Sequence, residues 1–310
     1  MQVPVVREGD VASWCTQWLN AGTSRALFRS GHLSVVLGLA LDDGREVVLK
    51  VRAPSSRINA CVEVQRGLWQ AGFPCPQPLA GPAPWETGGY IATAEAFVSG
   101  GVMLRSGPDS PRLFGSALER LVRSAPALSC IPSLDPPPPW FGAPQERANL
   151  WPSPPDRDYD LNEGSEPDWI DDIARRVRKR LHRSLLPFVV GHGDWESQNI
   201  RWNGTQLYVV HDWDSAVAGP EAVIAGAGAA AFPAEEKPSA ARLEESEVFL
   251  ASYSRARGHP WSHDEGEVAW ASGLWLMAYN AKIESLDGGP SPVLDRLASE
   301  AEARLRRAGA

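Results

Sequence analysis

The sequence VVGHGDWESQNI, residues 189–200, is the stretch from which the rest of the chain can be placed. A short apolar run leads into it, and a second apolar run, LYVV at residues 207–210, follows and ends next to Asp212. Two strands of this kind would bring Asp194 and Asp212 together, with Asn199 between them. A base for a hydroxyl proton, an amide oxygen and a carboxylate for Mg²⁺ are groups that phosphoryl transfer brings to one point. The stretch therefore predicts a site for phosphoryl transfer.

The spacing within this stretch is that of a kinase catalytic loop, His-x-Asp-x-x-x-x-Asn. His192, Asp194 and Asn199 follow the pattern, and the next strand ends in the run His211–Trp213. This combination resembles the aminoglycoside phosphotransferase / choline kinase-like family. The resemblance implies an α+β, two-lobed protein-kinase-like fold. Its small N-terminal lobe would hold an antiparallel sheet plus a helix, and its larger C-terminal lobe would be mainly helical.

The lobe boundary is expected where Ser99, Gly100 and Gly101 close an apolar strand. Residues 1–98 would then form the nucleotide-binding lobe, and residues 99–310 the catalytic and substrate-binding lobe. Repeated prolines forbid a long helix through residues 132–155. We predict a Pro-rich insertion at about residues 130–167, held to the lobe by apolar side chains such as Trp140 and Trp151.

The composition of the chain bears on whether the protein binds nucleic acid or membrane and on where it is located. The net charge is −8 and no basic face is visible, which argues against wide nucleic-acid binding. No apolar run approaches the ~20 residues that span a bilayer, and the first residues lack a signal-peptide pattern. The four cysteines show no Cys-x-x-Cys spacing and are interpreted as reduced thiols. We therefore expect a cytoplasmic monomer or homodimer that binds neither nucleic acid nor membrane.

The resemblance implies ATP and Mg²⁺ as cofactors and assigns residues to the nucleotide. Lys50, at the end of an apolar strand, would bind the phosphates, and Glu63, in a helix predicted over residues 56–70, would orient Lys50. Ser30 and Gly31 lie in the turn that would cover the nucleotide, although this turn has one glycine where kinases have three. The strand that ends near Phe97 would supply main-chain contacts to adenine at Glu95 to Phe97.

The remaining assignments concern the transfer itself. By resemblance, Asp194 is the catalytic residue that aligns the acceptor hydroxyl and takes its proton, while Asn199 and Asp212 are the metal ligands. His192 would brace the loop by hydrogen bonds. Asp214 would orient a metal ligand or cap a turn, and it is also a candidate substrate contact.

The acceptor is expected to be a small hydroxyl-bearing molecule. Eight acidic residues and one basic residue lie between Asp156 and Asp172. They form either a solvated loop leading into a helix or a negatively charged rim for a cationic acceptor. An aminoglycoside or related amine-bearing antibiotic is the family's default acceptor, which is compatible with antibiotic resistance. Trp275 and Tyr279, in an apolar C-terminal helix, are candidates for lining the acceptor site.

Two other interpretations stay open at this point. The first is a metal-dependent hydrolase, because paired His and Asp side chains can hold Zn²⁺ or Mn²⁺. Its ligands would be His192, Asp194, His211 and Asp212. The second is a catalytically inactive kinase-like module that binds nucleotide. All the core catalytic positions are filled, which argues against the second interpretation.

Overall fold

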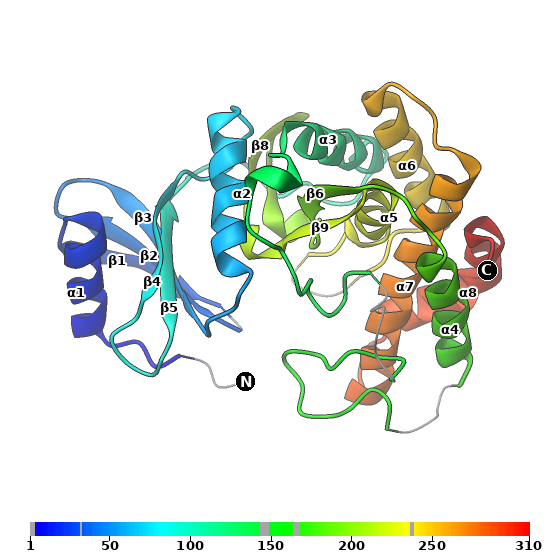
Figure 1. The fold of residues 1–310 in the computed structure, drawn as a ribbon, viewed down its shortest axis with the longest axis horizontal. Helices are drawn as coiled ribbons and strands as arrows, with labels where there is room; N and C mark the ends of the chain where they lie inside the picture. The colour runs from blue at the N-terminus through cyan, green and yellow to red at the C-terminus, as the bar shows by residue number, and fades with distance from the viewer. Residues whose placement is uncertain (1–3, 32, 143–148, 164–167, 236–238) are drawn as a thin grey trace.

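The computed structural model of the chain describes residues 4–31, 33–142, 149–163, 168–235 and 239–310. A five-stranded antiparallel sheet forms one end of the molecule, and a larger, mostly helical part forms the other (Figure 1). The predicted α+β, two-lobed arrangement is therefore confirmed. We call these parts the N-terminal lobe and the C-terminal lobe. The proposed boundary between residues 98 and 99 would fall just after the last strand of the sheet.

The N-terminal lobe is built on the strand order β1-β2-β3-β5-β4. An Asp-Gly turn joins β2 to β3, and Gly44 adopts the positive φ of +87° that such a turn favours. Trp14 and Cys15 of α1 pack with the buried residues of the sheet in one core. The elements of this lobe are α1 (Glu8–Leu19), β1 (Thr23–Ser30), β2 (Val35–Leu41), β3 (Glu46–Arg52), α2 (Ile58–Gln70), β4 (Pro78–Pro84) and β5 (Ile91–Ala96).

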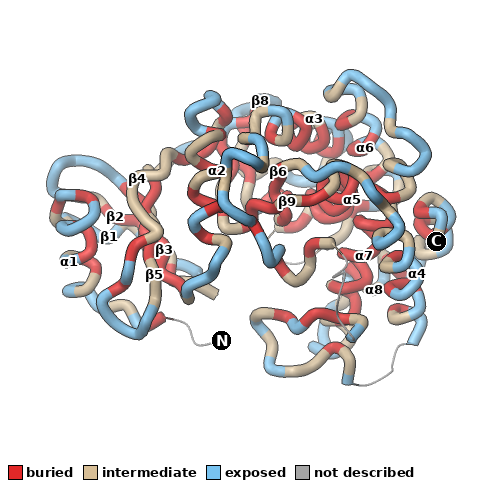
Figure 2. The backbone as a smooth tube through the Cα atoms, in the orientation of Figure 1, coloured by how far each residue is buried: buried red, intermediate tan, exposed pale blue. Residues whose placement is uncertain are grey.

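Helix α2 lies between the sheet and the helical part (Figure 1). Its side chains Cys61, Val64 and Leu68 are buried in the same core as Trp213 and Val217 of the C-terminal lobe. The red buried segments of Figure 2 run from α2 into this lobe. The packing of α2 is therefore decided by the C-terminal lobe as well as by the sheet.

Two small sheets position residues 189–200 in the C-terminal lobe; we call these residues the catalytic stretch because they resemble a kinase catalytic loop. β6 pairs with β9, with His192 opposite Ala216, and β7 pairs with β8, with Ile200 opposite Val210. The stretch between β6 and β7 and the residues after β8 are thereby brought to one place. The elements are α3 (Ser110–Ser124), α4 (Asp168–His182), β6 (Phe188–His192), β7 (Ile200–Asn203), β8 (Gln206–Val210), β9 (Ala216–Pro220), α5 (Glu221–Ala231), α6 (Leu243–Arg257), α7 (His263–Asp287) and α8 (Pro292–Ala308).

Helices α5 and α7 approach closely because small residues face each other. A Cβ added to Gly226 of α5 would collide with the carbonyl oxygen of Ala269, so the backbones leave no room for a side chain there. The sequence predicts this close packing from the run of Ala and Gly after Ile224. Helix α7 is thereby held beside the catalytic stretch.

The described part of the Pro-rich segment folds against the C-terminal lobe. Among its described residues, 131–142 and 149–163, no helix or strand forms. Phe141 and Trp151 are buried, and the Trp151 ring stacks on Trp275 with centroids 5.4 Å apart. The segment is therefore anchored by aromatic packing instead of by backbone pairing. None of the described helices is long and apolar enough to cross a membrane.

Candidate active site

The catalytic stretch is held by hydrogen bonds that pass through His192. The backbone N–H of Asp194 donates to Nδ1 of this histidine at 3.2 Å, so the ring proton lies on Nε2. Nε2 then donates to the carbonyl oxygen of His211, 3.1 Å away. Burial lowers the pKa of His192, which keeps the ring neutral in this arrangement. His192 thus ties the stretch after β6 to the residues after β8, as a bracing residue would.

Asp194 and Asn199 face each other across the turn between β6 and β7. Nδ2 of Asn199 donates to the carbonyl oxygen of Asp194 at 3.0 Å and to its Oδ2 at 2.9 Å. These bonds set the orientation of the Asn199 amide, because the nitrogen is committed to Asp194. The amide oxygen can then accept a hydrogen bond or ligate a metal ion.

The environment of Asp194 disfavours its charged form. Burial raises the pKa of this carboxyl to about 6, the negative charge of Asp212 adds to the rise, and the hydrogen bond from Asn199 opposes it. Glu196, two residues later, has its pKa raised by burial and by the charge of Asp194. Sequence reasoning missed Glu196, although its place within the motif puts it beside Asp194.

Asp212 has the opposite environment. Its backbone adopts a left-handed conformation, with φ of 62° and ψ of 53°, where the chain leaves β8. Its Oδ1 lies 3.6 Å from Nζ of Lys50, and its Oδ2 accepts a hydrogen bond from Ser215 at 3.2 Å. Burial alone would raise its pKa, but the charges of Lys50 and Arg52 outweigh burial and hold the pKa below the usual range. This carboxylate is ionised at neutral pH.

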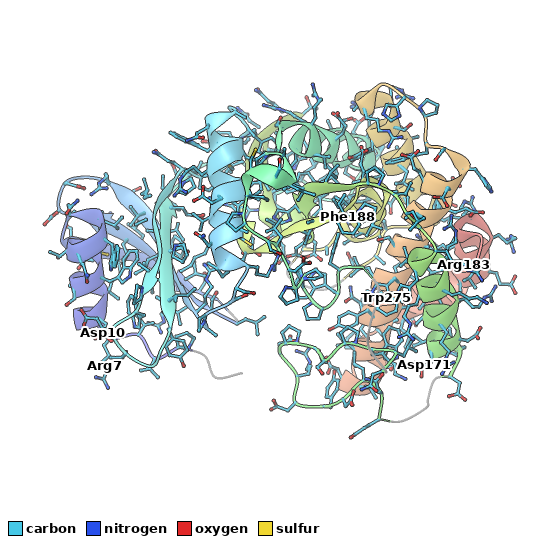
Figure 3. The ribbon with its side chains drawn as sticks, viewed as in Figure 1. Arg7, Asp10, Asp171, Arg183, Phe188 and Trp275 are labelled. Carbon is cyan, nitrogen blue, oxygen red and sulfur yellow. The ribbon has the colours of Figure 1, made fainter. Side chains whose placement is uncertain are left out.

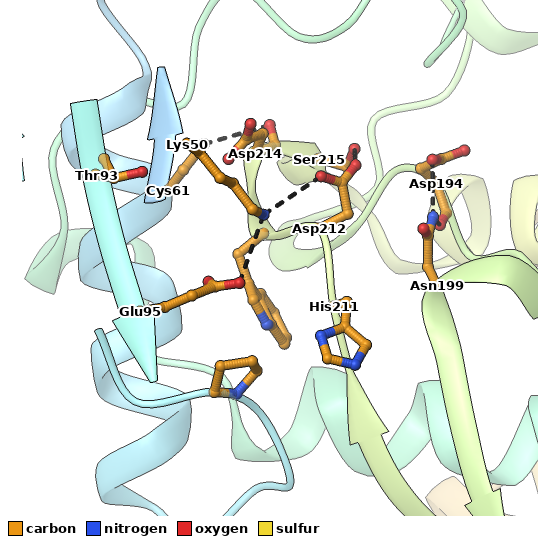
Figure 4. A network of polar contacts seen from close by, with 12 residues as sticks. Lys50, Cys61, Thr93, Glu95, Asp194, Asn199, His211, Asp212, Asp214 and Ser215 are labelled. Carbon is orange, nitrogen blue, oxygen red and sulfur yellow. Dashed lines mark hydrogen bonds and ion pairs between the residues drawn. The ribbon is translucent and has the colours of Figure 1, made fainter. Parts of the chain in front are cut away.

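Lys50 is held between two carboxylates (Figure 4). Its Nζ lies 3.7 Å from Oε1 of Glu95 and 3.6 Å from Asp212. The expected partner, Glu63, instead forms an ion pair with Arg66 one turn later on α2. The predicted pairing of Lys50 with Glu63 is therefore wrong. The physical reason is that Glu63 lies on the partly exposed side of α2, whereas the buried side of the helix faces the cores.

A second cation on β3 was missed by sequence reasoning. Arg52 is buried two residues beyond Lys50, on the same side of the strand. Its guanidinium pairs with the carboxylate of Asp214 and donates to Oγ1 of Thr93 at 3.0 Å. Lys50 and Arg52 thus meet Asp212 and Asp214 as two parallel ion pairs between the lobes. Asp214 acts as a neighbour that holds the Asp212 segment to β3.

Four residues of the N-terminal lobe were predicted from the sequence to contact the nucleotide without contacting Lys50: Ser30, Gly31, Glu95 and Phe97. Ser30 ends β1, and Gly31 follows in the turn with a positive φ of 117°, where a Cβ would collide with the carbonyl oxygen of Ser34. The N–H of Phe97 donates to the carbonyl oxygen of Glu46 at 3.0 Å, so this N–H is not available to a base. The side chain of Glu95 faces Lys50. The sequence had predicted only main-chain contacts from Glu95, to adenine.

A cavity of about 280 Å³ adjoins Asp194. Its walls come from the catalytic stretch with Asp194 and Glu196, from the Pro-rich segment with Trp140, and from α7 with Tyr279. Nε1 of Trp140 donates to the carbonyl oxygen of Gly193 at 3.0 Å, which fixes this indole beside the catalytic stretch. Leu33, two residues after Gly31, also lines the cavity. The cavity therefore lies between the turn after β1 and the helices of the C-terminal lobe.

The sequence profile of the phosphotransferase enzyme family (APH) matches residues 27–259, a range that contains Lys50, Asp194 and Asp212. The chain belongs to this phosphotransferase family. The resemblance stated from the catalytic stretch is thereby confirmed. A search of curated protein sequences finds no match.

Solved structures share the fold of this phosphotransferase at low sequence identity. Amicoumacin kinase hAmiN, solved with AMP-PNP, Ca²⁺ and Ami, is 14% identical with a TM-score of 0.63, covering 98% of this chain and 94% of that one. Spectinomycin phosphotransferase APH(9)-Ia, solved with ADP and spectinomycin, is 11% identical with a TM-score of 0.59, covering 99% and 94%. A choline/ethanolamine kinase family protein from Mesorhizobium loti is 17% identical with a TM-score of 0.54, covering 97% and 93%. These similarities support the kinase-like fold over nearly the whole chain.

One predicted substrate contact of the phosphotransferase is corrected. Trp275, labelled on α7 in Figure 3, is fully buried in one core with Trp151 and with Ile170 of α4, and it is absent from the described lining of the cavity. Tyr279, one turn later on α7, does line the cavity. Sequence periodicity placed both on an apolar helix but could not tell which of its sides faces the cavity.

The hydrolase interpretation fails on geometry in the part of the chain that the structure describes. No group of three or more His, Cys, Asp or Glu side chains is placed there to hold a metal ion. Both ring nitrogens of His192 are already hydrogen-bonded within the protein, so this histidine has no lone pair for a metal. Asp212 and the amide oxygen of Asn199 are instead oxygen donors of the kind that could hold Mg²⁺, which prefers few protein carboxylates plus phosphate oxygens.

Proposed function

We propose that this phosphotransferase moves the γ-phosphate of Mg·ATP to a hydroxyl group of a small molecule. The observation that carries the proposal is the meeting of Lys50 and Asp212, 3.6 Å apart, beside a cavity lined by Asp194. A cation for phosphates, a carboxylate for a metal and a base beside an acceptor cavity are the parts that phosphoryl transfer requires. Solved relatives that contain AMP-PNP or ADP give nucleotide binding further support.

On the nucleotide side, Lys50 would bind phosphate oxygens, and Ser30 and Gly31 would cover them. Asp212 and the amide oxygen of Asn199 would hold Mg²⁺, which would neutralise charge on the phosphates when bound. Main-chain groups next to Phe97 would contact adenine, with carbonyl oxygens as the acceptors, because the Phe97 N–H is already used. We also propose that residues 1–98 form the nucleotide-binding lobe and residues 99–310 the catalytic and substrate-binding lobe.

On the acceptor side, Asp194 would align the hydroxyl group and receive its proton. An alcohol is a far weaker acid than a carboxylic acid, so the proton transfer must be late. Most of the rate gain would then come from alignment and charge stabilisation. The raised pKa of Asp194 makes this carboxylate a better base than an exposed one.

The cavity favours an amine-bearing acceptor, with aminoglycosides and related antibiotics among the candidates. Glu196 and Asp194 present carboxylates on one side, while Arg157, the cation of the lining, is already paired with Asp156 and Asp287. Tyr279 lines the cavity, and its buried hydroxyl has no hydrogen-bond partner among the described residues, so in this proposal the hydroxyl gains a partner when the acceptor binds. We also propose that the protein is cytoplasmic and that it contributes to antibiotic resistance.

Calorimetric titration of ATP, with and without Mg²⁺, tests the proposal on the wild type and on Asp212→Ala. The wild type should bind Mg·ATP, and the variant should lose the dependence of binding on Mg²⁺. A screen of hydroxylated amines for stimulated release of ADP should then identify acceptors. Wild-type protein that binds no nucleotide would reject the proposal, and nucleotide binding without transfer to any acceptor would favour the inactive kinase-like module.

A further inference from the structure

We infer that Glu95 of β5, and not a carboxylate of α2, is the residue that positions Lys50 for the phosphates of ATP. The inference rests on the proposed function, since it concerns how the phosphate-binding lysine is held. It assigns a positioning role to a residue that the sequence places only on the strand leading to adenine.

The two oxygens of the Glu95 carboxylate have separate partners. Oε1 lies 3.7 Å from Nζ of Lys50, and Oε2 accepts a hydrogen bond of 2.8 Å from Nε2 of Gln65. The same Nε2 donates to the carbonyl oxygen of Pro76 at 3.0 Å, so Gln65 is itself held in place. Glu95, Lys50 and Gln65 are all buried, with exposed fractions of 7%, 8% and 4%. A buried carboxylate with one fixed oxygen can hold a lysine in one position.

Strand register accounts for the contact. Lys50 lies directly opposite Thr93 in the pairing of β3 with β5, and Glu95 is two residues beyond Thr93 on the same strand. Residues two apart on a strand point to the same side of the sheet, and diagonal neighbours on adjacent strands are within reach of long side chains. Lys50 and Glu95 therefore meet because of the sheet, whatever the position of α2.

Helical phase accounts for the failure of Glu63 to take this role. Glu63 and Gln65 are two residues apart on α2, about 200° around a helix with 3.6 residues per turn. Gln65 lies on the buried side and reaches Glu95, whereas Glu63 pairs with Arg66 at the partly exposed side. Helix α2 thus acts on Lys50 only indirectly, through a neutral amide that holds Glu95.

In protein kinases the lysine is paired with a helix glutamate, and moving the helix breaks the pair. Here the charged pair lies within one sheet, so displacement of α2 would loosen Glu95 without removing the carboxylate from Lys50. We expect a phosphate-binding lysine that is in place before nucleotide binds.

The test compares Glu95→Gln with the matched control Glu63→Gln, by calorimetry with Mg·ATP and with adenosine. Adenosine lacks all the phosphates that Lys50 would bind, so it reports the nucleoside part of the site alone. We expect Glu95→Gln to weaken Mg·ATP binding by about tenfold, the loss of a modest charge-assisted contact. Adenosine binding should stay unchanged in this variant, and Glu63→Gln should bind both ligands as the wild type does.

A double-mutant comparison separates positioning from a purely structural role. If Glu95 acts through Lys50, adding Glu95→Gln to Lys50→Met should cost no further Mg·ATP affinity. Gln65→Met removes the hydrogen bond to Oε2 of Glu95 and should weaken Mg·ATP binding less than Glu95→Gln does. If Glu95→Gln does not fold, Gln65→Met replaces it in the test. Equal losses for Mg·ATP and adenosine, or a loss in Glu63→Gln as large as in Glu95→Gln, overturn the inference. Failure of the wild type to bind Mg·ATP rejects the proposed function instead.

Discussion

Asp194 and Asp212 are 18 positions apart in the sequence and flank the same site, yet their surroundings differ in charge. Asp212 lies at the interface of the lobes, where Lys50 and Arg52 lower its pKa. Asp194 lies beside the cavity, where burial and the charge of Asp212 raise its pKa and the neutral amide of Asn199 donates a hydrogen bond to it. The surroundings of Asp212, the proposed metal ligand, are thus cationic, whereas those of Asp194, the proposed base, are acidic.

This difference supports the roles proposed for the two carboxylates beyond what their spacing supports. Carboxylates whose surroundings push their pKa values apart commonly divide the work between them. The one that stays ionised suits a metal ion, and the one with the raised pKa suits proton transfer. The four predictions that follow test this division of roles.

Asp194→Ala should separate the acceptor side from the nucleotide side. Turnover should fall by at least ~10²-fold because the acceptor hydroxyl loses its aligning base, while Mg·ATP affinity should stay near that of the wild type. Steady-state kinetics with an acceptor from the screen, paired with calorimetry, measures both quantities. Retained turnover in this variant would reject the role of Asp194.

Arg52→Met should disturb the cationic side. The change removes the partner of Asp214 and a donor to Thr93, so the free energy of unfolding should fall by about 1–3 kcal/mol. Denaturant titration measures the loss. The control is Arg66→Met, which breaks the more exposed pair with Glu63 and should cost less than about 1 kcal/mol. Equal losses of unfolding free energy in the two variants would mean that the Arg52–Asp214 pair stabilises the fold no more than the exposed Arg66–Glu63 pair does.

The pH dependence should also differ between the two sides. Asp194 must be ionised to receive a proton, so kcat/KM should fall as the pH drops below about 6, by about tenfold per pH unit. Mg·ATP affinity should hold to lower pH, because the pKa of Asp212 lies below the usual range. An acid limb near pH 4, where exposed carboxyl groups titrate, would contradict the raised pKa of Asp194.

Tyr279→Phe should give the smallest effect and test the cavity. Loss of one neutral hydrogen bond to the acceptor should raise the acceptor KM by about two- to tenfold, with kcat little changed. Stability should not fall, because the hydroxyl has no partner among the described residues. Tyr159→Phe is the control: its hydroxyl donates to Asp287 at 2.6 Å, so that variant should lose stability. An unchanged acceptor KM in Tyr279→Phe would remove Tyr279 from the acceptor site.

Local spacing made the fold class and the family predictable. The strands β6, β7 and β8 follow one another within residues 188–210, so the distances among His192, Asp194 and Asn199 are limited by short stretches of chain. The Asp-Gly turn between β2 and β3 and the prolines of residues 132–155 act locally in the same way. Such features need no knowledge of distant parts of the chain.

Partners across the fold were not predictable in this way. The sequence alone determined the catalytic stretch, the family and the strand that carries Lys50, because these depend on order and spacing along the chain. Tertiary structure decided that Glu95 and not Glu63 meets Lys50, that Arg52 pairs with Asp214, and that Trp275 is buried while Tyr279 lines the cavity. Each of these depends on which side of a helix or strand faces another element, and that is set by packing between residues far apart in sequence.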